Sequence, residues 1–354
     1  MAAGIGDFFE SLGALASLRK NLPDAHVTLL VSSKVYDYAA GCPWADAVLA
    51  MPSSRGRISA GIESIKLVKQ LAGSRFDAAL NLHEIGTWRG AARMAALITV
   101  SGAKITIGRN TAGKGFFFSE TVPDDPRDTH NQQWYYRRLV ELLTHKPAEE
   151  RSIPWINPSD TAAVEAMLAR HDITAHGGFI AVNPGSDRLT RRWDTKFFAE
   201  SADHFARNLK IPIIVLGNNK EQELAANVVK LCREKACSAA GQLTIGQLAA
   251  LIGRATMVIT TNSAAMHIAA IMGTPLVAVG GSGNPARDMP EGNPSKIAFL
   301  WKNVNCNPCY KYRCATGYRC MKAITPADAI SAGEKINEST PPHHNPLPEG
   351  ERKN

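Results

Sequence analysis

The sequence predicts an α/β protein of two domains, each built around a parallel β-sheet. Two observations carry this prediction: short apolar runs alternate with helical patterns along the chain, and the alternation stops once and then restarts. A chain of 354 residues is also long enough to form two hydrophobic cores. With 45% hydrophobic and 20% charged residues, the composition is typical of globular proteins and excludes a collagen, a coiled coil or a wholly disordered chain.

The N-terminal half supplies the first group of alternating elements. In order, the pattern predicts a helix, a strand, a helix and a strand at residues 8–21, 26–31, 58–72 and 76–82. Between residues 146 and 158, repeated X-Pro pairs signal turns and extended chain, and they interrupt the pattern. We therefore expect an N-terminal domain over residues 1–152.

The C-terminal half repeats the alternation. Strands are expected at residues 179–182, 211–216, 257–260 and 275–279, and helices at residues 197–208, 221–234, 245–253 and 264–272. We expect this domain to cover residues 153–337. The last residues, 338–354, are rich in Pro, His, Glu and Lys and are expected to form a disordered tail. Parallel sheets bind ligands at the carboxyl ends of their strands, so the loops that lead into helices are the candidate binding segments.

One candidate segment is the glycine-containing turn ahead of the first helix, residues 4–7. Glycine lets a backbone approach a ligand closely, and a helix start presents unpaired N–H groups. Asp7 in this turn has two interpretations: it caps the helix, or it acts as a general base.

Two more candidate segments follow predicted strands in the C-terminal half. Ser186, Arg191 and Arg192 lie in a turn whose hydroxyl and guanidinium groups suit a phosphate or diphosphate, with a solvated basic loop as the alternative. Glu221 begins a helix, where it either caps the helix or accepts hydrogen bonds from ribose hydroxyls.

The fourth candidate segment, residues 260–267, leads from a strand into a helix of small residues. Ser263 and the N–H groups after it are placed to bind phosphate at the positive end of the helix dipole. His267 lies one turn into this helix, where it is either a packed core residue or part of the site.

Taken in order, these segments resemble glycosyltransferase family 9, the ADP-heptose:lipopolysaccharide heptosyltransferases, from about residue 4 to residue 330. The resemblance rests on Gly6-Asp7, Asn183-Pro184-Gly185-Ser186 followed by Arg192-Trp193, Gly217-x-x-x-Glu221, and Asn262-Ser263-x-x-Met266-His267. It implies a GT-B architecture, in which two Rossmann-like domains with parallel sheets face each other across a cleft. It also implies an inverting, metal-independent glycosyltransferase that moves heptose from ADP-heptose onto a lipopolysaccharide core or a related bacterial glycan.

The resemblance also implies roles for single residues. In the family the first domain mainly holds the acceptor and the second holds the nucleotide sugar, and Asp7 matches the general base. The residues expected to bind substrate are Gly6, Ser186, Arg191, Arg192, Glu221, Asn262, Ser263, Ala264 and His267. The implied partners are a nucleotide-sugar donor and a glycolipid acceptor. The implied location is the cytoplasm, with peripheral contact to the inner membrane.

Three departures from the family pattern affect these expectations. Asn262 stands where the family usually has Asp, which leaves the donor sugar and its base open. Arg192-Trp193-Asp194 replaces the family's Lys-Trp-Pro, and arginine reaches a ligand differently from lysine. Relatives carry an apolar strand before the Gly-Asp turn, whereas this sequence has Met1-Ala2-Ala3, so we expect that strand to lie upstream of Met1.

A cysteine-rich segment, residues 306–320, also occurs in many members of the family. Cys306, Cys309, Cys314 and Cys320 follow the spacing C-x2-C-x4-C-x5-C. The resemblance implies no cofactor. The alternative is a metal site at these four cysteines, because thiolates at close spacing hold zinc or iron–sulfur clusters in other proteins.

Other classes of function remain as alternatives. A GT-B relative of another class, such as a nucleotide-sugar epimerase, would share the donor site, and a catalytically lapsed nucleotide-sugar-binding protein would keep binding without transfer. The net charge of +8 indicates an anionic partner. We expect no nucleic-acid binding, because the basic residues are spread without a Lys/Arg block or an aromatic platform.

Overall fold

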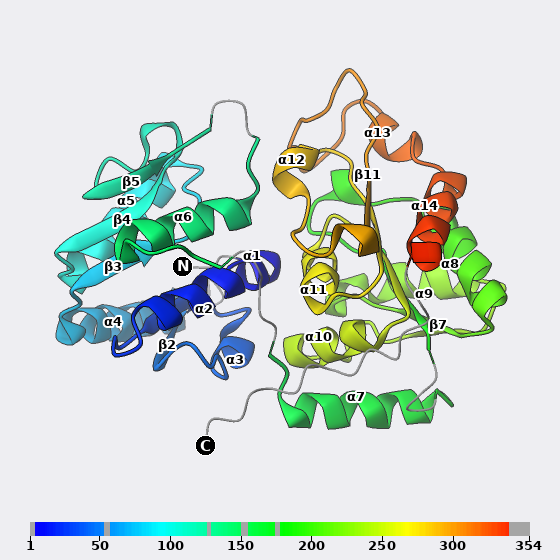
Figure 1. Ribbon diagram of the computed structural model, residues 1–354, viewed down its shortest axis with the longest axis horizontal. Helices are drawn as coiled ribbons and strands as arrows, with labels where there is room; N and C mark the ends of the chain where they lie inside the picture. Colours follow the sequence, from blue (N-terminus) through cyan, green and yellow to red (C-terminus); the bar gives the residue numbers. More distant parts are fainter. Residues whose placement is uncertain (1–3, 53–56, 126–128, 150–154, 174–177, 340–354) are drawn as a thin grey trace. The chain divides into compact units, whose positions relative to one another are not determined.

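The structure is a computed structural model that describes residues 4–52, 57–125, 129–149, 155–173 and 178–339. The chain forms two compact units, Met1–Ile153 and Pro154–Asn354, and in each of them helices flank the strands (Figure 1). Every strand pairing in the described residues is parallel. The prediction of an α/β protein with parallel sheets is therefore confirmed.

The N-terminal unit has a two-stranded and a three-stranded sheet. The strands are β1 (Thr28–Ser32), β2 (Ala47–Met51), β3 (Ala78–Asn81), β4 (Ile105–Asn110) and β5 (Glu120–Pro123). β1 pairs with β2, and β4 lies between β3 and β5. A cavity of about 620 Å³ is lined by β1, β3 and the first helices, and the described residues give each of these two strands a partner on one side only.

Helices cover the strands of the N-terminal unit. They are α1 (Ile5–Glu10), α2 (Leu12–Asn21), α3 (Tyr36–Ala39), α4 (Arg57–Ser74), α5 (Trp88–Ser101) and α6 (Gln132–Thr144). The single helix that we predicted over residues 8–21 is wrong, because the chain forms α1 and α2 with a break at Ser11. The Ser11 hydroxyl donates to the carbonyl of Phe8 at 2.7 Å, a local bond of the kind that competes with helix continuation.

The C-terminal unit has one six-stranded parallel sheet in the order β11-β10-β9-β6-β7-β8. The strands are β6 (Ile180–Asn183), β7 (Ile213–Val215), β8 (Ala236–Ser238), β9 (Met257–Thr261), β10 (Leu276–Val279) and β11 (Ile297–Leu300). The chain runs outward from β6 to β8, returns to the other side of β6 as β9, and continues outward to β11. This is the strand order of the Rossmann fold.

Helices pack on both faces of this sheet. They are α7 (Pro158–Arg170), α8 (Thr195–Leu209), α9 (Gln222–Leu231), α10 (Ile245–Arg254), α11 (Ala264–Met272), α12 (Pro285–Asp288), α13 (Arg319–Lys322) and α14 (Pro326–Ser339). α8 contacts α9 and α14, whereas α10 contacts α7 and α11. α14 continues to Ser339, so residues 338 and 339 are helical and our predicted tail begins too early; residues 340–354 lie outside the described residues.

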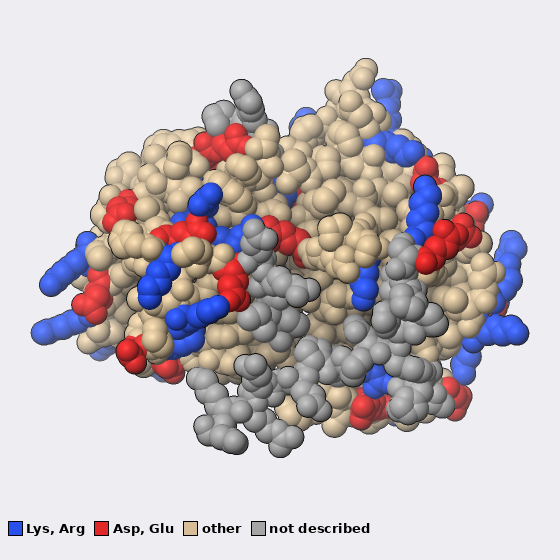
Figure 2. Space-filling model, viewed as in Figure 1, with Lys and Arg blue, Asp and Glu red and all other residues tan. Residues whose placement is uncertain are grey.

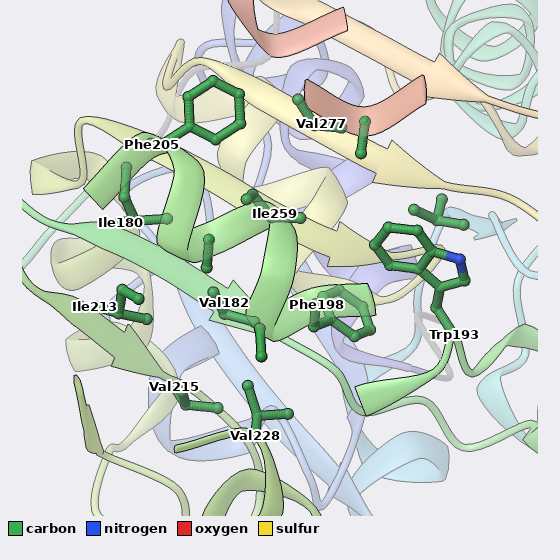
Figure 3. Packing of buried hydrophobic residues seen from close by; sticks show 14 of the residues in the cluster. Ile180, Val182, Trp193, Phe198, Phe205, Ile213, Val215, Val228, Ile259 and Val277 are labelled. Carbon is green, nitrogen blue, oxygen red and sulfur yellow. The ribbon is translucent and has the colours of Figure 1, made fainter. Parts of the chain in front are cut away.

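The core of the C-terminal unit fixes the segment that carries its arginines. Side chains from β6, β7, β9 and β10 pack against Phe198 and Phe205 of α8 (Figure 3). Trp193, which directly follows Arg192, is 3% exposed and belongs to this core, and its Nε1–H donates to the carbonyl of Ile324 at 2.9 Å. The chain is therefore anchored one residue after its arginine pair.

In the described part of the chain, no helix combines the length and the apolar character that crossing a bilayer requires.

Candidate functional site

The strand order predicts a ligand site in the C-terminal unit. In an open parallel sheet, ligands bind where neighbouring strands lead to loops on opposite faces, at the carboxyl ends of the strands. In this sheet the point lies between β6 and β9. β6 ends at Asn183 and β9 ends at Thr261, so two of the segments predicted from the sequence begin here.

Hydrogen bonds join these two segments. Asn183 Nδ2 donates to Ser263 Oγ at 3.0 Å, and Thr261 Oγ1 donates to the carbonyl of Gly185 at 2.8 Å. Ser263 is the N-cap of α11, but its side chain makes no capping bond and is instead held by Asn183 and Thr260. The N–H groups at the start of α11, beginning with Ala264, are thus not capped by a side chain, as an anion-binding helix start requires.

Arg192 and Glu221 lie on the β7 side of this point. Arg192 Nε donates to the carbonyl of Ser186 at 3.1 Å, and its Nη2 is 3.9 Å from Glu221 Oε1. Glu221 is 7% exposed, and its Oε2 accepts a hydrogen bond from the backbone N–H of Asn218. The Glu221 side chain therefore caps the short 3-10 turn Asn219–Glu221 and not α9, the helix we expected it to cap, while its other carboxylate oxygen faces the arginine.

Arg191, Asn262 and His267 form the other side of the candidate site. Arg191 Nη1 donates to Asn262 Oδ1 at 3.2 Å. His267 is 9% exposed, and burial, followed by the positive charge of Arg191, lowers its pKa to about 3. The imidazole is therefore neutral at physiological pH, and His267 combines the two interpretations from sequence: it is packed in the core beside a residue of the site.

Asp7 and Gly6 lie in the N-terminal unit, in α1. Asp7 Oδ2 accepts a hydrogen bond from the backbone N–H of Gly4 at 2.9 Å, so Asp7 caps its helix from the third position while Gly4 is the N-cap. His83 lies near enough for electrostatic interaction: burial lowers the pKa of this half-buried imidazole, and the charge of Asp7 opposes the shift. The capping bond leaves the second carboxylate oxygen of Asp7 without a hydrogen bond from any described residue.

The cysteine-rich segment does not form a recognisable metal centre. Within the described ranges, no three or more His, Cys, Asp or Glu side chains are grouped so as to hold an ion. Cys306 Sγ and Cys314 Sγ instead both contact Thr316 Oγ1, at 3.3 and 3.4 Å. The segment also reaches the candidate site, because Arg188 Nη1 donates to the carbonyl of Tyr310 at 2.9 Å.

The sequence analysis missed one residue that lies beside Arg191 and Asn262. Asp288, at the end of α12, lies 3.4 Å from Arg191 Nη2 and is 12% exposed at its side chain. A signal was available: Asp288 follows the glycine-rich loop after the strand predicted over residues 275–279, and that loop leaves the same edge of the sheet. What the sequence did not show is that this strand, β10, pairs directly with β9.

Comparison with solved structures agrees with this architecture. A glycosyl transferase family 9 protein from Veillonella parvula superposes with a TM-score of 0.78 at 22% identity, covering 95% of both chains. The Escherichia coli heptosyltransferase WaaC with ADP superposes with a TM-score of 0.70 at 14% identity, covering 94% of this chain and 97% of that one. The predicted GT-B fold is thereby confirmed.

Sequence comparison identifies the family. The lipopolysaccharide core heptosyltransferase OpsX of Haemophilus influenzae is 23% identical over 306 residues, covering 85% of this chain and 83% of the relative. Lipopolysaccharide heptosyltransferase 3 of Escherichia coli is 23% identical over 345 residues, covering 95% and 97%. The family model described as glycosyltransferase family 9 (heptosyltransferase) matches residues 64–318. The chain therefore belongs to glycosyltransferase family 9 and is a glycosyltransferase.

Proposed function

We propose that this glycosyltransferase moves heptose from ADP-heptose onto a lipopolysaccharide core. The observation that carries the proposal is the convergence of Ser186, Arg192 and Glu221 with the uncapped start of α11 at one edge of the sheet. The names of the two curated relatives, both lipopolysaccharide heptosyltransferases, support the choice of sugar and acceptor.

The donor's parts have matching partners in this arrangement. A diphosphate carries negative charge on several oxygens, which suits the guanidinium of Arg192 and the N–H groups at the start of α11. Glu221 supplies a buried carboxylate that can accept hydrogen bonds from ribose hydroxyls. We therefore propose that the nucleotide lies between β6 and β9, with its diphosphate toward Ser263.

The chemistry needs one base and a stabilised leaving group. We propose that Asp7 takes the proton of the acceptor hydroxyl as that oxygen attacks C1 of the heptose, while the bond from C1 to the diphosphate oxygen breaks and ADP leaves. One displacement of this kind inverts the configuration at C1. The negative charge that develops on ADP is stabilised by arginine and by the start of α11, a role that metal ions play in other transferases.

A donor screen tests the proposed function. The purified chain is incubated with lipid A–core acceptor and with ADP-heptose, UDP-sugars or GDP-sugars, and product mass is measured. We expect a mass increase of one heptose with ADP-heptose alone, a single inverted anomer by NMR, and the same rate in excess EDTA. Transfer from another donor would overturn the heptose proposal, conversion of the donor without acceptor would indicate an epimerase, and binding without transfer would indicate a lapsed enzyme.

The variant Asp7→Asn separates the base from the helix cap. The asparagine Oδ1 can still accept the bond from Gly4, so we expect an unchanged melting temperature and a transfer rate at least about a hundredfold lower. Asp37→Asn, in the first turn of α3, is the matched control and should transfer normally. Wild-type transfer by Asp7→Asn would remove Asp7 as the base.

We further propose peripheral contact with an anionic membrane surface, supported by the net charge of +8. Figure 2 shows basic and acidic side chains interspersed over the visible surface of both units, so a contact made here would be weak and sensitive to salt. Co-sedimentation with anionic vesicles at low salt, lost at high salt and with neutral vesicles, is the expected result.

A further inference from the structure

The two adjacent arginines of the candidate site are each paired with a different carboxylate. Arg192 faces Glu221, and Arg191 faces Asp288. Arg191 is held at two points, because its Nη1 donates to Asn262 Oδ1 at 3.2 Å while its Nη2 lies 3.4 Å from Asp288 Oδ2. The guanidinium is thus fixed between β9 and the segment that follows β10.

The backbone beside Asp288 leaves room for its carboxylate. A Cβ added to Gly283 would lie 1.5 Å from Asp288 Oδ2, so no other residue fits there unless the carboxylate moves. Burial raises the pKa of Asp288, while the charges of Arg191 and then of Arg287, and a hydrogen bond from the Asn262 side chain, lower it again. This buried acid therefore depends on its arginine neighbours for its negative charge.

The cluster also presents one donor that no described residue satisfies. Arg191 Nε is buried and makes no hydrogen bond to a described residue, whereas the side-chain amide of Asn262 interacts with the carboxylate of Asp288. Asn262 is 3% exposed. A buried donor without a protein partner has lost its hydration without compensation, so in a native protein it indicates an acceptor that arrives from outside.

We propose that Asp288 is a positioning residue of the donor site, which holds Arg191 so that Arg191 Nε binds an acceptor oxygen of the nucleotide sugar. The inference rests on the proposed function in that it takes a nucleotide sugar as the ligand. It goes beyond that function by assigning to the segment after β10 a carboxylate that sets the geometry of the site without touching the reacting atoms.

A positioning role and a merely electrostatic role of Asp288 predict opposite changes in nucleotide affinity when its charge is removed. Removing the negative charge of Asp288 leaves the site more positive, which by Coulomb attraction alone would tighten binding of an anionic nucleotide. If Asp288 holds Arg191 in place, the same change weakens binding. We expect Asp288→Asn to weaken ADP affinity about tenfold in calorimetric titration and to lower kcat/KM for the donor by a similar factor.

A double-mutant cycle tests whether Asp288 acts through Arg191. We expect Arg191→Gln with Asp288→Asn to bind ADP no worse than Arg191→Gln alone. Once the guanidinium of Arg191 is absent, removing the carboxylate that positions it has no further effect on binding. Additive losses, or ADP binding by Asp288→Asn that equals or exceeds wild type, would overturn the proposal. Glu234→Gln, which removes the charge from an exposed ion pair with Arg207, is the matched control and should leave binding unchanged.

Two more variants keep the test decisive if Asp288→Asn folds poorly. Gly283→Ala leaves Asp288 in the chain but displaces its carboxylate, and should weaken ADP binding as Asp288→Asn does; Gly86→Ala, with open space around it, is its control. In Asn262→Asp with Asp288→Asn, the carboxylate moves to the other partner of Arg191, and we expect most of the lost affinity to return. No rescue in this folded double variant would overturn the proposal.

The outcome is separable from that of the donor screen. If wild type binds another nucleotide instead of ADP, ADP-heptose is excluded as donor and the cycle is run with the nucleotide that binds. Normal donor use with no coupling between positions 191 and 288 would overturn only the role of Asp288. A wild-type protein that binds no nucleotide would overturn both.

Discussion

At the scale of single residues, the carboxylates of the proposed donor site occupy space that glycines leave open. A Cβ on Gly185 would lie 2.3 Å from Glu221 Cδ, just as one on Gly283 would meet Asp288. Each glycine thus lets a buried acid approach the backbone beside an arginine. The requirement at these positions is for the absence of a side chain, because neither glycine has a left-handed backbone.

Glu221 provides a test in which capping and ligand binding are separated. In Glu221→Gln the side-chain oxygen can still accept the bond from Asn218, so we expect little change in the melting temperature. The charge that faces Arg192 and that would bind ribose is lost, and nucleotide affinity should fall at least about tenfold. Calorimetric titration with ADP measures this, and Glu223→Gln on the exposed side of α9 is the control; a similar loss in both variants would contradict a specific role.

His267 should make the C-terminal unit sensitive to acid. Its folded pKa is about 3 and its ordinary pKa is 6.5, so between these values the unfolded chain binds more protons than the folded one. The contribution of His267 to the free energy of unfolding is therefore complete above pH 6.5. Between pH 6.5 and about pH 3 acidification lowers that free energy by about 1.4 kcal/mol for each pH unit. Urea unfolding of wild type and His267→Gln at pH 7 and pH 5 should show a smaller fall for the variant; equal falls would contradict the neutral, buried imidazole.

At the scale of elements, the sequence predicted the bounds of helices better than it predicted which strands pair with each other. α11 runs over 264–272 as expected, because its small apolar residues end at Gly273, which takes the left-handed conformation common after helices. The break at Ser11 was missed because apolar spacing continues through it. Strand pairing depends on contacts between residues distant in sequence. Nothing local to residues 275–279 therefore showed that the loop after this strand would place Asp288 beside Arg191.

The site segments were predictable for a related reason. Ser186, Glu221 and Ser263 lie in the segments that connect strands to the next helix, and in a parallel sheet that place in the sequence fixes the edge at which they lie. The pairing of Arg191 with Asn262 was not predictable, because it depends on side-chain direction within the loop that leads to Trp193. Sequence therefore identified the segments, and packing decides which of their side chains meet.

The buried Trp193 fixes the loop that carries Arg191 and Arg192 to the core of the C-terminal unit. Trp193→Phe removes the hydrogen bond to the carbonyl of Ile324 and part of a buried ring, and should destabilise the C-terminal unit by about 1–3 kcal/mol. Trp88→Phe, at a residue that is 62% exposed, should change stability by less than about 0.5 kcal/mol. Chemical unfolding measures both, and equal effects would show that the Trp193 ring does not anchor the loop.

At the scale of the whole molecule, the roles that we propose are divided between two compact units, each with its own core. The N-terminal unit carries Asp7, and the C-terminal unit carries all the residues that we assign to the donor. Each unit has its own sheets and buried clusters, so each has the means to unfold cooperatively. The donor should therefore stabilise one unit only.

Calorimetric melting with and without ADP tests this division. We expect two transitions, of which ADP raises one; at a hundred times its dissociation constant, ADP adds about 2.7 kcal/mol, or roughly 5–10 °C for a unit of this size. Trp193→Phe should lower that same transition and so assign it to the C-terminal unit, and Glu221→Gln should reduce the shift without moving the transition of the free protein. A single transition that ADP raises as a whole would contradict the division, because it would mean that both cores unfold together and share the energy of donor binding.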